Sequence, residues 1–239
     1  MSSAIRATDW RAATVTRIAP ETPRAATLTL DVPGWNGHRA GQHVDVRLTA
    51  EDGYRAQRSY SIASAPGAPL QITVEELLDG EVSPWMVSVA REGDEFEIRG
   101  PFGGWFVWDP RASDPLLLIA GGSGLVPLMS MLRHRRAAGA GVPARLLVSA
   151  REPDDVLYAD ELPQTGAEVF VSYTRRPPRG WTGYARRVDR DMLREVNVPG
   201  ARTYVCGPTG FVESVANDLV ALGVDPATIR TERFGATGG

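Results

Sequence analysis

An uncharged stretch from Pro115 to Leu132 constrains the fold of this chain more than any other segment. Its length is roughly that of a membrane-spanning helix, but glycines and a proline interrupt it between Gly121 and Pro127. Leu116 to Ala120 is therefore better explained as a buried strand that runs into a tight glycine turn, with a buried helix beginning at about Leu125. Such a succession is typical of a parallel α/β sheet.

The rest of the second half continues this alternation. Further apolar strands are predicted at Arg145–Ser149, Val169–Tyr173 and Thr203–Cys206, and helices at Leu125–Ala138 and Phe211–Leu222. We therefore expect a parallel sheet with helices on its faces, in which ligands bind beyond the carboxyl ends of the strands. The glycine turn lies at such an end, although a strand-to-helix turn without any ligand is an equally simple interpretation of that motif alone.

The first half, to about Asp109, has the pattern of short strands instead. β-branched or aromatic residues, separated by turns with Gly, Pro or Asp, mark the segments Ala13–Ile18, Ala25–Val32, His43–Thr49, Gln57–Ala63, Leu70–Glu75 and Glu95–Arg99. This spacing predicts a six-stranded antiparallel β-barrel. Because Pro and Asp break the pattern between Trp108 and Pro115, we expect one domain at residues 1–109 and an α/β domain at 110–239.

Charge and cysteine content limit the classes of function. The 239 residues carry a net charge of -3, which gives no reason to expect nucleic acid or an anionic membrane as a partner. Cys206 is the only cysteine, so the chain forms no internal disulfide and supplies no set of thiolates for an iron-sulfur cluster. No metal site is predicted. The chain opens without the pattern of a secretory signal, so a cytoplasmic protein is expected.

The segment Arg58-Ser59-Tyr60-Ser61 carries the first chemical signature. In an extended strand Arg58 and Tyr60 share one face, and the two serines share the other. The forked guanidinium of Arg58 suits a phosphate, and the ring of Tyr60 suits stacking on a heteroaromatic system. An ordinary strand, with a core tyrosine and a solvent-exposed arginine, is the plain alternative.

The segment Gly80-Glu81-Val82-Ser83-Pro84 resembles the start of a helix. Ser83 is a plausible N-cap and Pro84 fits the first helical position. A helix start presents free backbone donors, which suit a pyrophosphate. Taken without the upstream strand, a capped connecting helix explains the segment as well.

Several ordered motifs together resemble those of the ferredoxin-NADP reductase superfamily. They are Arg58-Ser59-Tyr60-Ser61, the Gly80–Ser83 turn, Gly100-Pro101-Phe102-Gly103, the Gly121–Pro127 segment and Cys206-Gly207-Pro208. The match extends from about Trp10 to Phe234, and its specificity lies in order and spacing. The resemblance implies that the barrel is an FAD-binding domain and that the α/β half is an NAD(P)-binding domain.

The resemblance also assigns flavin contacts. They are Arg58, Ser59, Tyr60, Ser61, Thr73, Val74, Glu75, Gly80, Glu81, Val82 and Ser83. Tyr60 is expected to pack on the flavin ring, and Ser61 to place a hydroxyl within reach of a ring nitrogen. The segment from Ile98 to Gly104 resembles the members that use FAD rather than FMN, with Trp105 or Phe106 covering the adenine.

The nicotinamide side is expected at the ends of two parallel strands. The contacts that the resemblance implies are Gly122, Ser123, Gly124, Pro127, Cys206, Gly207 and Pro208. Ser123 corresponds to a hydroxyl residue beside the nicotinamide. Cys206 is expected to position the reactive carbon and not to act as a nucleophile, although a lone cysteine is more often a small core residue. The family often has Met where this chain has Phe211.

The last strand-like segment, Thr231-Glu232-Arg233-Phe234, is followed by glycines. Glu232 and Phe234 look like the terminal acid and aromatic residue of the family, the latter covering the flavin until nicotinamide displaces it. Many relatives end on a tyrosine, whereas here a Phe precedes the tail Gly235–Gly239. An edge strand with a frayed end is the alternative.

Basic residues near the third strand of the α/β half suggest a preference between the two nicotinamide cofactors. Thr174 and Arg175 match a Ser-Arg pair that relatives use for NADP, and Arg187 stands where a second contact is common. Arginine suits a 2′-phosphate, whereas an acidic residue would suit a free 2′-hydroxyl. NADP is therefore favoured, NAD remains possible, and solvated surface arginines are the alternative.

These expectations combine into one activity. The resemblance implies hydride transfer from NADPH to FAD and electron delivery to an external acceptor such as a ferredoxin, with Ser61, Cys206 and Glu232 around the reacting atoms. Hydride transfer needs those atoms within about 3 to 3.5 Å, so both domains must share one cleft. A flavin reductase that uses free flavin, and a non-catalytic flavin-binding module, remain alternatives. The sequence does not identify the acceptor.

Overall fold

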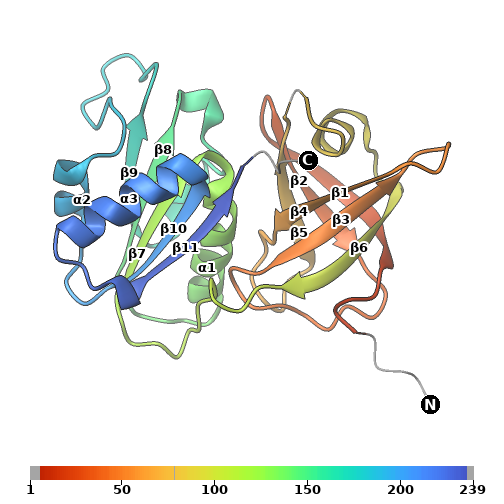
Figure 1. Ribbon diagram of the computed structural model, residues 1–239, viewed down its shortest axis with the longest axis horizontal. Coiled ribbons are helices and arrows are strands. Elements are labelled where there is room, and N and C mark those ends of the chain that lie inside the picture. Colours follow the sequence, from red (N-terminus) through yellow and green to blue (C-terminus); the bar gives the residue numbers. More distant parts are fainter. Residues whose placement is uncertain (1–5, 78, 236–239) are drawn as a thin grey trace.

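Two sheets, each in its own lobe, make up the computed structural model, which describes residues 6–77 and 79–235 (Figure 1). One lobe is a six-stranded antiparallel barrel and the other a five-stranded parallel sheet with helices on both faces. Both predicted architectures are confirmed. Residues 236–239 of the glycine tail lie outside the described residues.

The barrel strands are β1 (Arg11–Thr22), β2 (Ala25–Asp31), β3 (His43–Thr49), β4 (Arg55–Ser61), β5 (Leu70–Glu75) and β6 (Glu95–Phe102). They pair in the order β4-β3-β6-β1-β2-β5. Alternate positions such as Leu28, Val46 and Ile72 are fully buried, as expected when one face of each strand lines the interior. A short π-helical turn, η1 (Trp85–Val89), packs on this core through the buried Met86.

The second lobe contains β7 (Leu116–Gly121), β8 (Ala144–Ala150), β9 (Glu168–Tyr173), β10 (Arg202–Pro208) and β11 (Ile229–Phe234). They pair in parallel in the order β11-β10-β7-β8-β9. The central strand β7 has no exposed residue, which explains its continuous apolar sequence. Short single turns at η2 (Gly122–Gly124), η3 (Pro153–Asp155), η4 (Leu162–Gln164) and η5 (Pro226–Thr228) complete the connections.

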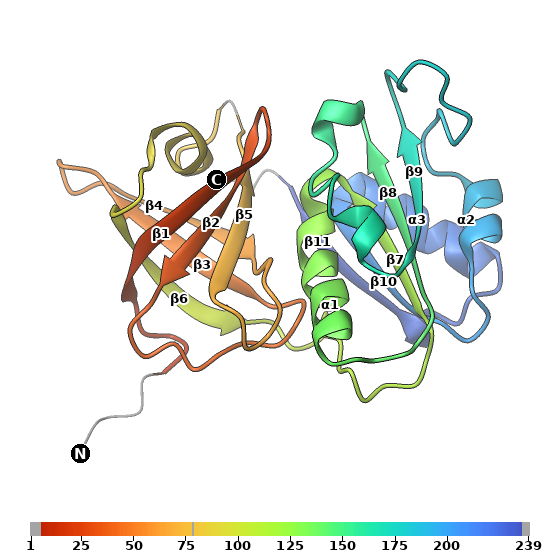
Figure 2. The same ribbon diagram turned by 180° about the vertical axis from the view of Figure 1, so that it is seen from behind.

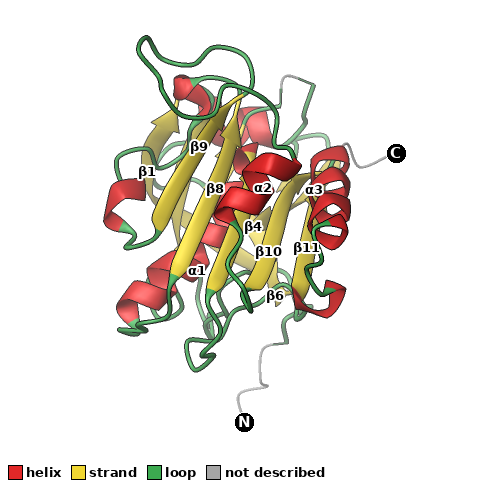
Figure 3. Cartoon of the chain, turned by 90° about the vertical axis from the view of Figure 1, so that its left-hand side faces the viewer, coloured by secondary structure: helices red, strands yellow, loops and turns green. Residues whose placement is uncertain are grey.

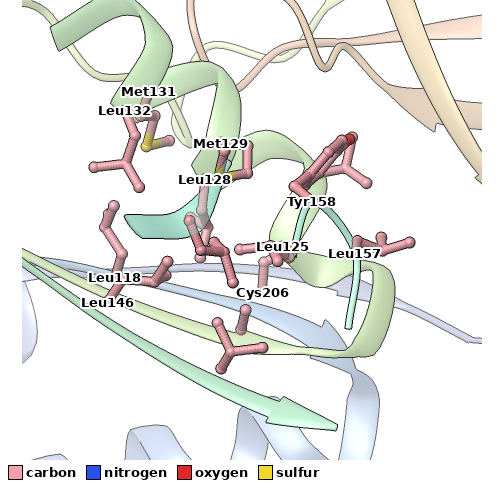
Figure 4. Packing of buried hydrophobic residues seen from close by; sticks show 14 of the residues in the cluster. Leu118, Leu125, Leu128, Met129, Met131, Leu132, Leu146, Leu157, Tyr158 and Cys206 are labelled. Carbon is pink, nitrogen blue, oxygen red and sulfur yellow. The ribbon is translucent and has the colours of Figure 1, made fainter. Parts of the chain in front are cut away.

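Three helices cover the two faces of this sheet. Helix α1 (Leu125–Ala137) lies on the face toward the barrel, and α2 (Arg190–Val196) and α3 (Thr209–Ala221) lie on the opposite face (Figures 2 and 3). Leu125 and Leu128 of α1 pack above Leu118 and Cys206, as Figure 4 shows. None of the helices in the described ranges is long and apolar enough to cross a membrane, and the uncharged stretch divides into β7, η2 and α1 as expected.

Buried polar contacts join the two lobes. The hydroxyl of Tyr158 donates to Thr73 Oγ1 at 2.5 Å, and Thr73 in turn bonds Thr27. Arg133 of α1 donates to the carbonyl of Ala63 at 2.8 Å. Tyr158 is buried and has a positive φ of 55°, a backbone conformation that a bulky residue adopts only under strong constraint. The relative position of the lobes is therefore set by specific contacts.

The predicted elements differ from the observed ones in identifiable places. Strand β1 extends further at both ends than the predicted segment, and α2 was not predicted because it has only seven residues. Strand β11 matches the alternative of a last edge strand. Phe106 is wrong as a cover for adenine, because it is buried at the lobe junction with its ring edge-on to Tyr204 at 5.3 Å. Trp105 is exposed beneath the guanidinium of Arg230, and its contact with the adenine stays a prediction.

Candidate functional site

An open seam runs down one side of the barrel. Strands β4 and β5 are the two edges of the sheet, and the structure joins them by one isolated bridge between Ile62 and Ile72. Within the described residues, the outer edge of β4 from Arg58 to Ser61 faces no strand partner, and neither does the edge of β5 from Thr73 to Glu75. These backbone donors and acceptors are available to a ligand.

The side chains of β4 alternate as predicted. Tyr60 is packed against the barrel core, and its burial raises the pKa of the phenol, which therefore stays neutral. Ser59 lies on the other face and donates to Asp45 at 2.6 Å. The predicted contact residue Ser59 thus has its hydroxyl occupied by the protein, whereas the ring of Tyr60 stands beside the seam.

Arg58 is already engaged by an acid of the same chain. Its guanidinium lies 2.9 Å from the carboxylate of Glu81 and also donates to the carbonyl of Gln57. The second carboxylate oxygen of Glu81 accepts a 2.6 Å hydrogen bond from Tyr54. Hydrogen bonding from Tyr54, with the charge of Arg58, lowers the pKa of Glu81. An anion therefore already occupies the position in front of Arg58.

The prediction that Ser83 caps a helix is wrong. Its hydroxyl makes no cap bond and instead accepts the backbone N–H of Leu77 at 3.0 Å, which ties the turn back on itself. The helix that follows is only five residues long. Gly80 is required here, because a Cβ would lie 2.8 Å from Ser83 Oγ. Val82 points into the barrel core, so backbone and not side-chain contacts with a flavin are expected from Val82 and Ser83.

A cleft of about 530 Å³ opens beside this turn. Its aromatic lining residues are Tyr54, Trp85 and Phe96, and the charged Glu81 and Arg47 also line it. This volume is within the usual range for small-ligand pockets. The cleft therefore offers room for a second ring system near Arg58.

The three residues of β5 that were predicted to contact the flavin differ in the exposure of their side chains. The side chains of Thr73 and Val74 are buried, and the Thr73 hydroxyl is occupied by Tyr158 and Thr27. Glu75 is partly exposed and lies 3.6 Å from Arg151. Any contact of Thr73 or Val74 with a flavin is therefore left to the backbone along the open edge.

The glycine turn is explained partly by packing within the chain. A Cβ on Gly124 would lie 2.1 Å from the carbonyl oxygen of Cys206, and one on Gly121 would lie 2.8 Å from the ring of Phe211. Glycine at these two positions thus allows the turn to pack closely against β10 and α3. Gly122 has a φ of 55° and faces the carboxylate of Glu75. Ser123 beside it is partly exposed, whereas Pro127 is buried in α1.

Cys206 lies in the buried stretch of β10 and is 1% exposed. Burial, and next the charge of Glu232, raise the pKa of its thiol well above the usual value. An uncharged thiol is a poor nucleophile, which agrees with a positioning role. Gly207 is buried behind it against Phe211, and Pro208 is exposed at the strand end.

Glu232 brings the two lobes together at this point. It stands in register with Cys206 on the parallel pair β10–β11, and its carboxylate lies 3.6 Å from Nδ1 of His43 in the barrel. His43 is the partner of Ser61 on the antiparallel pair β3–β4. Three residues predicted from separate motifs, Ser61, Cys206 and Glu232, therefore border one region between the lobes.

Sequence reasoning did not single out His43. The imidazole Nδ1 and the Oε2 atom of Glu232 are both buried without a hydrogen-bond partner in the described residues, and 3.6 Å is too long for a hydrogen bond. Two unsatisfied polar atoms at a lobe interface call for a partner, which a bound ligand or water would supply. Strand register places His43 there, and no local motif identifies it.

Phe234 lies at the end of β11, in register with Pro208, and its side chain is exposed. The structure therefore leaves its ring free to cover a neighbouring ligand. A stacking role remains a prediction.

The basic residues after β9 differ in how they are held. Thr174 donates to the carbonyl of Ala150, whereas Arg175 and Arg187 are exposed and form no ion pair within the described residues. The neighbouring Arg176 and Arg186 are paired with Glu152 and Asp189. The two arginines that sequence reasoning selected are thus available to an anion, as is the exposed Arg179.

Two family models match the chain. Residues 13–107 match the model described as oxidoreductase FAD-binding domain, and residues 118–217 match the model described as oxidoreductase NAD-binding domain. The first coincides with the barrel and the second with the parallel sheet.

Curated relatives are similar over most of this chain. A glycine betaine monooxygenase reductase subunit from Chromohalobacter salexigens is 34% identical, with 83% of this chain and 56% of the relative covered. The NADH oxidoreductase HCR of Escherichia coli is 33% identical, with coverages of 90% and 65%. A flavohemoprotein of Bordetella pertussis is 32% identical, with coverages of 97% and 62%. The chain thus spans less than two thirds of the length of these relatives.

Solved structures share the fold. The FAD/NAD-binding domain of a nitric oxide dioxygenase from Vibrio cholerae superposes with a TM-score of 0.82 at 24% identity, covering 94% of this chain and 98% of that one. A ferredoxin NADP⁺ reductase from Neisseria gonorrhoeae, crystallised with FAD and NADP, gives a TM-score of 0.80 at 19% identity, with coverages of 94% and 98%.

Proposed function

The chain belongs to the ferredoxin reductase-like family of FAD- and NAD-binding oxidoreductases, and from this premise we propose that it takes hydride from NADPH and delivers electrons to a separate redox protein. The proposal assigns residues 1–109 to FAD binding and 110–239 to NAD(P) binding. It places the protein in the cytoplasm and includes no nucleic-acid partner.

One observation carries this proposal. Glu232 of the parallel sheet lies 3.6 Å from His43 of the barrel, next to the strand position of Ser61 and in register with Cys206. Hydride transfer requires donor and acceptor atoms within about 3 to 3.5 Å of each other. A site to which each lobe contributes one face supports the proposal, because it would allow the two rings to lie against each other.

The barrel residues fit an extended dinucleotide. Tyr60, Arg58 and Ala56 follow one another on the same face of β4, in steps of roughly 6.6 Å. With a flavin ring on Tyr60, Arg58 would hold the phosphates and the cleft that Ala56 and Tyr54 line would receive the adenosine. This succession supports FAD over FMN, which has no adenosine.

The protein contributes stacking, orientation and charge. When bound, FAD accepts the hydride and passes electrons on singly or in pairs. Tyr60 holds the ring plane, and Ser61 places a hydroxyl at the lobe interface. Cys206 shapes the nicotinamide side with an uncharged thiol. The carboxylate of Glu232 favours the oxidised nicotinamide, which carries a positive charge.

Exposed arginines support NADPH as the donor. Arg175 and Arg187 have no acidic partner within the described residues, and a 2′-phosphate would provide one. We propose a ferredoxin or another redox component as the acceptor, by analogy with the monooxygenase reductase subunit to which the chain is similar.

The test is anaerobic reduction followed by acceptor assays. Purified protein loaded with FAD is mixed with NADPH, and the loss of flavin absorbance near its visible maximum is followed. Bleaching, followed by reoxidation with separately expressed ferredoxins or oxygenase components, supports the proposal. Flavin that stays oxidised would identify a non-catalytic binding module.

A second candidate is a flavin reductase that releases its flavin. The pairing of Arg58 with Glu81 favours it, because a phosphate must displace or accommodate that acid. Gel filtration of the loaded protein separates the two functions. A reductase that serves a protein partner keeps its FAD, whereas a flavin reductase loses it and needs free flavin for turnover.

A further inference from the structure

Three segments meet around a single carboxylate beside strand β4 of the barrel. Arg58 comes from β4, Tyr54 from the hairpin that leads into β4, and Glu81 from the turn after β5. The two oxygens of Glu81 take separate donors, the Tyr54 hydroxyl at 2.6 Å and the Arg58 guanidinium at 2.9 Å. Glu81 thus holds the arginine that the proposed function assigns to the flavin phosphates.

This ion pair is not needed to hold the turn. The side chains of Arg58 and Glu81 are 40% and 46% exposed, and exposed pairs contribute little to stability. The turn is anchored instead by the buried Val82 and Met86 and by the bond from Leu77 N–H to Ser83 Oγ. The pair can therefore open without disturbing the barrel.

We propose that Glu81 competes with the flavin phosphates for Arg58 and so determines how tightly phosphorylated flavins are held. The inference rests on the proposed function, in which Arg58 meets the diphosphate of FAD. Carboxylate and phosphate are equivalent acceptors for a guanidinium fork. When phosphate takes Arg58, Glu81 keeps only its bond from Tyr54 and stands beside added negative charge.

The lost bond between Glu81 and Arg58 and the repulsion between Glu81 and the phosphate both weaken phosphate binding. Two like unit charges about 4 Å apart in water change a dissociation constant roughly fivefold, and the diphosphate of FAD carries about two charges. Physiological salt screens part of this repulsion. We expect removal of the Glu81 charge to tighten FAD binding roughly five- to twentyfold.

The effect must depend on phosphate. Riboflavin has the same ring and no phosphate, so it meets Tyr60 but does not compete with Glu81 for Arg58. Glu81 is then a specificity-determining residue that keeps FAD exchangeable. Without Glu81 the site would bind FAD more tightly.

The experiment titrates apoprotein with FAD, FMN and riboflavin, using the quenching of flavin fluorescence. Glu81→Gln should lower the dissociation constants for FAD and FMN, with the change of roughly five- to twentyfold for FAD, and leave that for riboflavin unchanged. Glu168→Gln is the matched control, because it removes one carboxylate from an exposed ion pair with Arg145 in the other lobe. It should change FAD binding less than about twofold.

Two results separate the inference from its premise. If the wild-type protein binds FAD but Glu81→Gln binds it no more tightly, or tightens riboflavin equally, the competition is refuted while the flavin site stands. If neither protein binds any flavin, the proposed function itself fails. Circular dichroism on each variant checks that the barrel is intact.

Discussion

The carboxylate of Glu232 lies 3.6 Å from Nδ1 of His43, so the last strand of the parallel sheet reaches the barrel where β3 pairs with the end of β4. This contact makes Glu232 common to both faces of the proposed site. Glu232 also contributes to the raised pKa of the Cys206 thiol, so its charge acts on the strand end where Cys206 lies.

Glu232→Gln should slow hydride transfer roughly tenfold, because loss of a charge-assisted interaction costs about 1 to 2 kcal/mol. Stopped-flow reduction by NADPH measures the rate, and flavin content should not change. Glu168→Gln is a matched control, since Glu168 pairs with Arg145 at the far end of the parallel sheet. Equal rates in both variants would contradict a role for Glu232.

Tyr60→Ala should lower flavin retention at least tenfold, because an aromatic platform contributes about 1 to 3 kcal/mol per stacked ring. Tyr60→Phe should retain flavin as the wild type does, since the phenol stays neutral and stacking needs only the ring. Flavin absorbance relative to protein after gel filtration gives both values. Unchanged flavin content in the alanine variant would refute the stacking role.

Arg175→Ala should raise the KM for NADPH roughly tenfold and leave that for NADH unchanged, because only NADPH carries a 2′-phosphate. Arg176→Ala is the control, since Arg176 is paired with Glu152 and should affect both donors little. Initial rates with each donor provide the comparison. A rise for both donors would point to a structural role for Arg175.

The Cys206 thiol should resist alkylation in the folded protein. Burial raises its pKa, so the thiolate needed for reaction is scarce between pH 7 and 9, and the side chain is 1% exposed. Iodoacetamide should therefore label the native protein at least about a hundredfold more slowly than the protein unfolded in urea. The rate of NADPH oxidation should show no change with pH in this range that is due to titration of the cysteine. Rapid labelling with loss of activity would contradict the positioning role.

Periodic segments were predictable because their signals are local. The uncharged residues of β7 and the glycine turn after them needed only spacing and composition, and the structure confirms both. The helix α1 follows directly, with Leu125 and Leu128 buried as its apolar pattern indicates. Order along the chain also sufficed to propose Tyr60 and Cys206 as site residues.

Non-local contacts explain the rest. Ser83 has the residue type of an N-cap, but a backbone N–H six residues earlier, at Leu77, takes its hydroxyl. His43 reaches the site through strand register and through the packing of two lobes, and neither leaves a motif in the sequence. The requirement for glycine at Gly124 comes from the Cys206 carbonyl, which is distant in sequence.

Opposite pH responses are expected from two partly buried acids at the lobe interface. Desolvation raises the pKa of Glu21, which accepts a hydrogen bond from Thr27 at 2.6 Å. The folded state therefore favours the protonated acid, and this stabilisation is present below the ordinary pKa and is lost as pH rises through the folded one. Glu161 has a lowered pKa because Arg133 donates to it, so its stabilisation is present above the ordinary pKa and lost on acidification.

Glu21→Gln keeps an acceptor for Thr27 and removes the cost of an ionised, half-buried carboxylate. It should gain at most about 1 kcal/mol of unfolding free energy at pH 7.5 and less at pH 4, since the group is partly exposed. Glu161→Gln should instead lose stability at pH 7.5, by roughly 1 kcal/mol or more, and little at pH 4. Urea unfolding of both variants at the two pH values measures the differences. If both variants change the free energy of unfolding in the same direction at pH 7.5, the charge states assigned to Glu21 and Glu161 are wrong. Opposite pKa shifts should give changes of opposite sign.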